Sequence, residues 1–109
     1  MRLTYAIRYV ADMDRALAYH RDVLGLDLAF QSPFWSEFAT GETRLAQHVA
    51  SAEKPAGTVQ LGFGAEDLAG RYAARAENGL DFTGPPVREH GRLLGRFRDC
   101  EGAENSISG

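Results

Sequence analysis

The stretch that decides the fold is VADMDRALAYHRDVLGL, residues 10–26. Asp12 can cap a helix, because its carboxylate accepts hydrogen bonds from the first free N–H groups. Apolar and aromatic positions then recur at spacings of four, three and four: Met13, Leu17, His20 and Leu24. This periodicity predicts an amphipathic helix that packs Leu17 and Leu24 on a sheet, with His20 packed rather than functional. Gly25 is expected to end the helix in a left-handed conformation.

Strands are predicted on both sides of this helix by runs rich in β-branched and aromatic residues. In the first half of the chain, these runs cover residues 3–10, 26–31, 34–40 and 43–50. A loop over residues 51–57 then separates the two halves. Further strands are expected over residues 58–63, 81–83, 92–98 and 105–108. A second helix should begin at Glu66 or Asp67 and end at Gly79.

The second half of the chain repeats the first. Gly25-Leu26-Asp27-Leu28 follows the first helix, and Gly79-Leu80-Asp81-Phe82 follows the second, an offset of 79 − 25 = 54 residues. The order of elements in each half is one strand, one helix and three strands. We therefore predict two βαβββ modules, about residues 1–50 and 58–109, within a single domain over 1–109. A module of roughly 55 residues is small for a core of its own, so the modules should pack together or pair with another copy.

The composition is that of a globular protein. The chain has 109 residues, 12 basic against 15 acidic side chains and a net charge of −3, which argues against a nucleic-acid partner. A single cysteine, Cys100, excludes an internal disulfide. No apolar run is long enough for a membrane span, and residues 1–10 lack the apolar block of a signal peptide. We expect a cytoplasmic protein.

Residues 10–26 resemble the opening motif of the vicinal oxygen chelate superfamily, which includes glyoxalase I, bleomycin-resistance proteins, fosfomycin-resistance enzymes and extradiol dioxygenases. FRDCEGAEN, residues 97–105, resembles the F-x-D-P-[DE]-G-N segment of these proteins, with Cys100 in the place of proline. The resemblance implies an α+β fold in which two βαβββ modules form a curved, cup-shaped mixed β-sheet with helices on the outside. It also implies a homodimer.

The resemblance places four metal ligands on four strands of such proteins. Carried over one by one, these positions fall at Tyr5, near Leu45, at or next to Gln60, and at Ser106. Tyrosine, leucine, glutamine and serine form a poor ligand set for a divalent ion, so we expect no metal and no cofactor. A displaced site that uses His48 or Glu104 stays an alternative, although a one-residue slip turns a strand side chain to the opposite face.

The sequence predicts a ligand surface lined by aromatic rings. Strand alternation places Tyr5, Ile7 and Tyr9 on one face, and the third strand is rich in aromatic residues. Planar guests stack on such rings, and a few amides and hydroxyls can orient them. The predicted ligand-binding residues are Tyr5, Ile7, Tyr9, Phe34, Trp35, Phe38, Leu45, Gln60 and Ser106.

Three functions are compatible with these residues. The first is a metal-free small-molecule binding protein of the bleomycin-resistance type that holds an apolar or aromatic ligand in the cup. The alternative is a divalent-metal-dependent lyase, isomerase or dioxygenase with displaced ligands. A third is a metal-free enzyme with Tyr5, His48 or Glu104 as acid or base. The sequence leaves open whether the protein is an enzyme.

Overall fold

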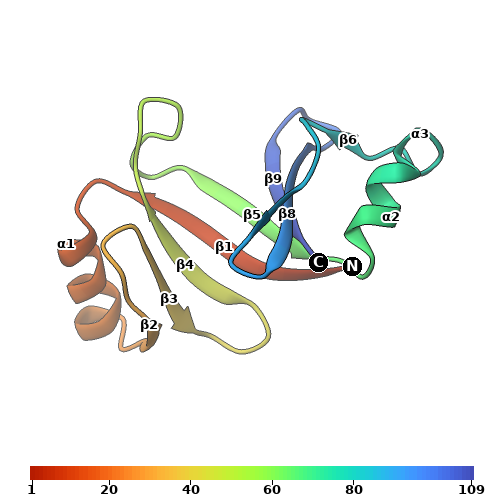
Figure 1. The fold of residues 1–109 in the computed structure, drawn as a ribbon. Coiled ribbons are helices and arrows are strands. Elements are labelled where there is room, and N and C mark those ends of the chain that lie inside the picture. Colours follow the sequence, from red (N-terminus) through yellow and green to blue (C-terminus); the bar gives the residue numbers. More distant parts are fainter. The chain divides into compact units, whose positions relative to one another are not determined.

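The computed structural model describes residues 1–109, which divide into two compact units (Figure 1). The N-terminal unit comprises residues 4–60, and the C-terminal unit comprises residues 61–109 together with residues 1–3. Each unit contains a mixed β-sheet and helices, as expected for the predicted α+β class. None of the helices is long and apolar enough to cross a membrane.

The N-terminal unit has the predicted order of one strand, a helical segment and three strands. The elements are β1 (Arg2–Val10), α1 (Met13–Ala18), the π-helical turn η1 (Tyr19–Val23), β2 (Asp27–Phe30), β3 (Trp35–Ala39) and β4 (Arg44–Val49). The strands lie in the order β2-β3-β4-β1. β4 pairs in parallel with β1 and antiparallel with β3. β4 is therefore flanked on both sides.

The C-terminal unit repeats this arrangement. Its elements are β5 (Val59–Gly64), α2 (Leu68–Ala73), α3 (Arg75–Asn78), β6 (Asp81–Phe82), β7 (Val87–Glu89), β8 (Arg92–Arg98) and β9 (Glu104–Ser108). β5 pairs in parallel with β9, and β9 pairs antiparallel with β8. Both β6 and β7 pair with β8. They are two parts of one strand position, divided at Gly84-Pro85-Pro86 because proline has no N–H for the ladder.

The helical segment of the N-terminal unit begins as predicted and ends differently. The Asp12 carboxylate accepts a hydrogen bond from the Arg15 N–H at 3.1 Å. Gly25 has a φ of +71°, a conformation that glycine adopts without steric cost. Between these residues, the Leu24 N–H donates to the Tyr19 carbonyl five residues back, at 3.2 Å, which defines a π-turn. The wider turn rotates Leu24 away from the helix face that carries Met13 and Leu17. Leu24 is 51% exposed, so the prediction that it packs on the sheet is wrong.

One face of the N-terminal sheet packs against α1. The buried residues of this core are Val10, Met13, Leu17 and Phe38, with Leu28, Leu45 and Val49 packed around them. Phe38 has no exposed surface, and Leu45 contacts the same cluster. The structure therefore places these two predicted ligand residues in the core instead. His20 is half-buried here, with its ring centroid 5.8 Å from that of Phe38.

The segment that resembles the F-x-D-P-[DE]-G-N motif forms a turn between β8 and β9. The Asp99 Oδ1 atom accepts hydrogen bonds from the Glu101 and Ala103 N–H groups at 2.9 and 3.0 Å. These two backbone hydrogen bonds lower the pKa of the Asp99 carboxyl below its ordinary value. The ionised carboxylate therefore stabilises the turn, and this contribution disappears as the pH falls through the pKa of the folded state.

Asp99→Asn removes this titration while it keeps an oxygen that can accept the same hydrogen bonds. We expect the free energy of unfolding of the variant to fall less steeply than that of the wild type as the pH drops below the ordinary aspartate pKa of about 4. Urea unfolding at a series of pH values measures the two slopes. Parallel pH profiles would contradict the assigned role of the carboxylate.

Leu17→Ala and Leu24→Ala test the π-turn as a matched pair. Leu17 is 4% exposed, so its truncation should cost about 2–5 kcal/mol in the free energy of unfolding. Leu24 is half-exposed, so its truncation should cost less than about 1 kcal/mol. Urea unfolding followed by circular dichroism gives both values. Similar losses for the two variants would indicate a regular helix with both leucines buried.

Candidate functional site

The sheet face of the N-terminal unit opposite α1 carries most of the polar and aromatic side chains of that sheet. Tyr5 pairs with Arg44, Ile7 with Ala46, and Tyr9 with His48 across β1 and β4. Trp35 pairs with His48, and Glu37 with Ala46, across β3 and β4. Because side chains alternate along a strand, these residues share the sheet face opposite the one that carries the core residues. We call this set the aromatic face: Tyr5, Ile7, Tyr9, Trp35, Glu37, Arg44, Ala46 and His48.

A single carboxylate connects the three strands of the aromatic face. The Glu37 Oε2 atom accepts from the Trp35 indole Nε1–H at 2.7 Å, and Oε1 accepts from Arg44 Nη1 at 2.8 Å. The Tyr5 hydroxyl lies 3.4 Å from both oxygens. The Glu37 side chain is only 13% exposed, so water competes weakly for these contacts. The hydrogen bond to Glu37, and then its negative charge, raise the pKa of the Arg44 guanidinium above its ordinary value.

Aromatic rings from β3 and β1 meet above β4. The ring centroids of Trp35 and Tyr5 are 5.6 Å apart in an edge-to-face arrangement. Since β4 lies between the two strands, the rings meet over its middle residue, Ala46, which is fully buried. The small side chain of Ala46 leaves room for this contact. Tyr5, Tyr9, Trp35 and His48 each keep part of their surface exposed.

His48 presents a free basic nitrogen on this face. Its Nδ1 atom lies 2.8 Å from the Val49 carbonyl oxygen, which can only accept, so Nδ1 carries the proton. In the neutral ring, Nε2 therefore holds a lone pair. The imidazole centroid lies 5.1 Å from the Tyr9 ring and 6.1 Å from the Trp35 ring. The backbone and the two rings fix both the tautomer and the orientation of His48.

Tyr9 is held at the other side of β1. Its hydroxyl donates a hydrogen bond of 2.9 Å to the Gln60 Oε1 atom, and Gln60 is only 4% exposed. The contact engages the oxygen atom through which Gln60 could bind a cation. It therefore fixes the Tyr9 ring beside His48 instead of offering a metal ligand.

The predicted ligand residues are distributed over different parts of the structure. Tyr5, Ile7, Tyr9 and Trp35 lie on the aromatic face, and Gln60 adjoins it through Tyr9. The other four lie elsewhere: Phe38 and Leu45 in the core, Phe34 at a 68% exposed position before β3, and Ser106 on β9 of the C-terminal unit.

Sequence reasoning missed Glu37 and Arg44. Glu37 alternates with Trp35, which was a signal that both share a face. The short turn over residues 40–43 could have predicted how β3 and β4 pair, and this pairing places Arg44 on the same sheet face as Glu37.

The residues at the family's metal positions do not suit a divalent cation. The carboxylate nearest to Tyr5 is that of Glu37, which the Tyr5 hydroxyl and the Arg44 guanidinium both contact. The negative charge of Glu37 is therefore already balanced by Arg44. Of the displaced candidates, His48 offers one nitrogen, and Glu104 pairs with Arg96 at 3.2 Å in the C-terminal unit. No group of three or more His, Cys, Asp or Glu side chains is placed to hold a metal ion. A dication at Glu37 would also meet the positive charge of Arg44.

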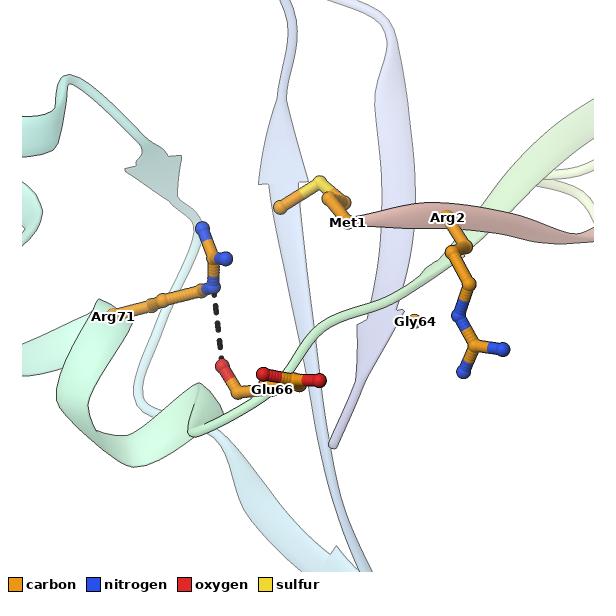
Figure 2. Close-up of a pocket in the computed structure, with 5 residues that line it drawn as sticks. All are labelled: Met1, Arg2, Gly64, Glu66 and Arg71. Atoms are coloured by element: carbon orange, nitrogen blue, oxygen red, sulfur yellow. Dashed lines mark hydrogen bonds between the residues drawn. The ribbon is translucent and has the colours of Figure 1, made fainter.

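A pocket of about 250 Å³ belongs to the C-terminal unit. It is lined by Met1, Arg2, Gly64, Glu66 and Arg71. In Figure 2, the Arg71 Nε–H points at the Glu66 backbone carbonyl, a hydrogen bond of 3.2 Å. The lining contains no aromatic ring, histidine or thiol. We therefore take the aromatic face as the candidate functional site.

Comparison with known proteins identifies the family. Residues 2–107 match the model of the Glyoxalase/Bleomycin resistance protein/Dioxygenase superfamily. The chain belongs to this superfamily. The match covers nearly the whole chain, so it confirms the resemblance and the α+β fold inferred from residues 10–26 and 97–105. No curated protein matches the chain.

Solved structures of the superfamily fold are similar to this chain. Methylmalonyl-CoA epimerase from Mycobacterium tuberculosis has a TM-score of 0.80 at 16% identity, with 98% of this chain and 86% of that chain covered. A variant of the Streptomyces coelicolor epimerase, in complex with 2-nitronate-propionyl-CoA, has a TM-score of 0.79 at 15% identity, with coverage of 99% and 93%. A hypothetical protein from Bacillus halodurans has a TM-score of 0.80 at 15% identity, with coverage of 98% and 92%. At such identities, the likeness shows the fold alone.

Glu37→Gln tests whether the carboxylate organises the aromatic face. The substitution keeps the shape of the side chain but removes the charge that Trp35 and Arg44 share. Because hydrogen bonds to charged groups contribute about 1.5–3 kcal/mol, we expect a loss of roughly that size in the free energy of unfolding. The indole Nε1–H resonance of Trp35, the one tryptophan of the chain, should move in the proton NMR spectrum.

Glu42→Gln is the control, since Glu42 is an exposed carboxylate in the nearby turn. Its stability should stay within about 0.5 kcal/mol of the wild type. An unchanged indole resonance in the Glu37 variant would show that the carboxylate does not hold Trp35.

Proposed function

We propose that the protein is an enzyme of the isomerase or lyase class that moves a proton on a small carbonyl-containing substrate at the aromatic face. One observation carries this proposal: His48 has its tautomer fixed by the Val49 carbonyl and its Nε2 lone pair free among aromatic rings. The fold similarity to methylmalonyl-CoA epimerases supports an enzyme of this class over a protein that only sequesters its ligand.

His48 is the group best suited to take the proton. The lone pair on Nε2 can accept a proton from a carbon beside a carbonyl, and the protonated ring can return it later. Return to the same or a neighbouring carbon gives isomerisation, and departure of a β-substituent gives a lyase reaction. Glu37 is less well placed for this role, because both of its oxygens already accept hydrogen bonds, from Trp35 and Arg44.

The aromatic rings would position the substrate. Trp35 and Tyr5 meet edge to face above β4, and Tyr9 lies beside His48. A planar carbonyl compound that stacks on these rings would be held near the imidazole, which is the main requirement for proton transfer. The proposed reaction uses no metal step, because the residues at the ligand positions do not suit a dication.

A second candidate function is metal-free binding of the bleomycin-resistance type. It is favoured by the same three rings, since stacking alone is sufficient for sequestration. The homodimer, the small-molecule ligand, the absence of a nucleic-acid partner and the cytoplasmic location stay predictions of the sequence.

His48→Gln tests the proposed proton transfer. The assay follows deuterium incorporation from D₂O by NMR for a panel of acyl-CoA thioesters and 2-oxo acids that includes methylmalonyl-CoA. We expect the wild type to exchange the proton next to the carbonyl of at least one compound. The variant should do so about 10²–10⁴-fold more slowly, the usual contribution of a general base.

His90→Asn is the matched control. His90 lies in the exposed β7–β8 turn with a φ of +50°, a conformation that asparagine tolerates. The control should exchange at the wild-type rate. Wild-type exchange by the His48 variant, or no exchange of any compound by the wild type, would overturn the enzymatic proposal. Saturable binding of a panel compound without exchange would favour sequestration.

A further inference from the structure

We propose that Arg44 anchors an anionic oxygen group of the ligand, so that the aromatic face selects planar carboxylic acids over neutral analogues. The inference rests on the proposed function only in placing the ligand on the aromatic face. It follows from the charge beside one of the family's metal positions: Tyr5 shares the Glu37 carboxylate with a guanidinium, that of Arg44.

The Arg44 guanidinium has one side engaged and the rest available. Nη1 donates to Glu37 at 2.8 Å, and the side chain is 46% exposed, so its remaining N–H donors can reach a ligand. A guanidinium carries five N–H donors in a planar fork, and two of them match the oxygens of a carboxylate. Because Glu37 already holds one end of the guanidinium, binding of a ligand would cost less side-chain freedom of Arg44 than at an unpaired arginine.

The charges of Glu37 and Arg44 favour an anionic ligand that binds with moderate affinity. Glu37 and Arg44 are the two charged members of the aromatic face, so a ligand meets a neutral pair in which the indole and the Tyr5 hydroxyl share the negative charge. Affinity would then come mainly from the directed N–H donors and from stacking, and less from net charge. A cationic ligand has no free carboxylate oxygen on this face and would be repelled by Arg44.

The spacing of residues along β4 sets the distance between Arg44, which would bind the anionic group, and His48, which would take the proton. Arg44, Ala46 and His48 lie on the same face, and four residues of strand place the Cα atoms of Arg44 and His48 roughly 13 Å apart. Both side chains are long enough to reduce this separation, and the Trp35 and Tyr5 rings meet over Ala46 between them. A compact planar acid could therefore bind Arg44 through its carboxylate and extend over the Trp35 and Tyr5 rings toward Nε2 of His48.

Benzoate and benzamide form a suitable pair of probes, because they have nearly the same shape and differ in charge. Their binding is followed through the fluorescence of Trp35, the one tryptophan of the chain, excited at a wavelength that neither probe absorbs. We expect a saturable change with benzoate and an affinity at least about tenfold lower for benzamide. Equal affinities, or no binding of benzoate, would overturn the inference.

Arg44→Gln should reduce the affinity for benzoate to that for benzamide. Arg44→Lys keeps the charge but loses the planar fork, so its affinity should be intermediate. Arg71→Gln is the matched control, because Arg71 lines the pocket of the C-terminal unit, the rival site for an anion (Figure 2). Loss of benzoate binding in the Arg71 variant, with retention in the Arg44 variants, would assign the anion to that pocket and overturn the inference.

The experiment keeps its meaning if Arg44→Gln unfolds, because Arg44→Lys and the comparison of the two probes on the wild type still test the anchor. His48→Gln separates this inference from the proposed function, since the preference for benzoate over benzamide should remain while proton exchange is lost. Proton exchange on substrates without any preference of the protein for carboxylic acids over neutral analogues would overturn only the proposed role of Arg44. Anion binding at Arg44 without exchange would overturn the enzymatic proposal alone.

Discussion

The Glu37 carboxylate is the constraint on which the candidate site depends. It binds the indole of Trp35 from its own strand, the guanidinium of Arg44 from β4 and the hydroxyl of Tyr5 from β1. A half-buried carboxylate requires several donors, and these three groups supply them. Because these contacts engage both oxygens of Glu37, the group of this face left to accept a proton from a ligand is His48, and Arg44 is its one cation. The chemistry available to the site therefore follows from which groups Glu37 occupies.

The fold could be predicted largely from local signals. Asp12 caps the first helix, Gly25 and Gly79 end the two helical segments in left-handed conformations, and the strands fall within a few residues of their expected bounds. The packing of Leu24 could not be predicted in this way, because helical periodicity assumes 3.6 residues per turn and the π-turn departs from it. The division of one strand into β6 and β7 follows from two prolines that break the ladder.

The candidate site could be predicted only in part. Alternation alone placed Tyr5, Ile7 and Tyr9 together, since it needs no knowledge of neighbouring strands. Trp35 and Phe38 are three residues apart and so point to opposite faces of β3, which separates a site residue from a core residue. The partnership of Glu37 with Arg44 and Tyr5 depends on the register of three strands, and that register is a property of the folded sheet.

The parallel pairing of β1 with β4 has a consequence for the entropy cost of forming the site. Tyr5 and Arg44 are 44 − 5 = 39 residues apart in sequence, whereas β3 and β4 are joined by a short turn. Closing a long loop costs more chain entropy than closing a hairpin, so the pairing of β1 with β4 is the more costly of the two. The contacts of Glu37 with Trp35 and Arg44 lie within the β3–β4 hairpin. Both tyrosines of the aromatic face belong to β1, so the complete ligand surface depends on the pairing that closes the longer loop.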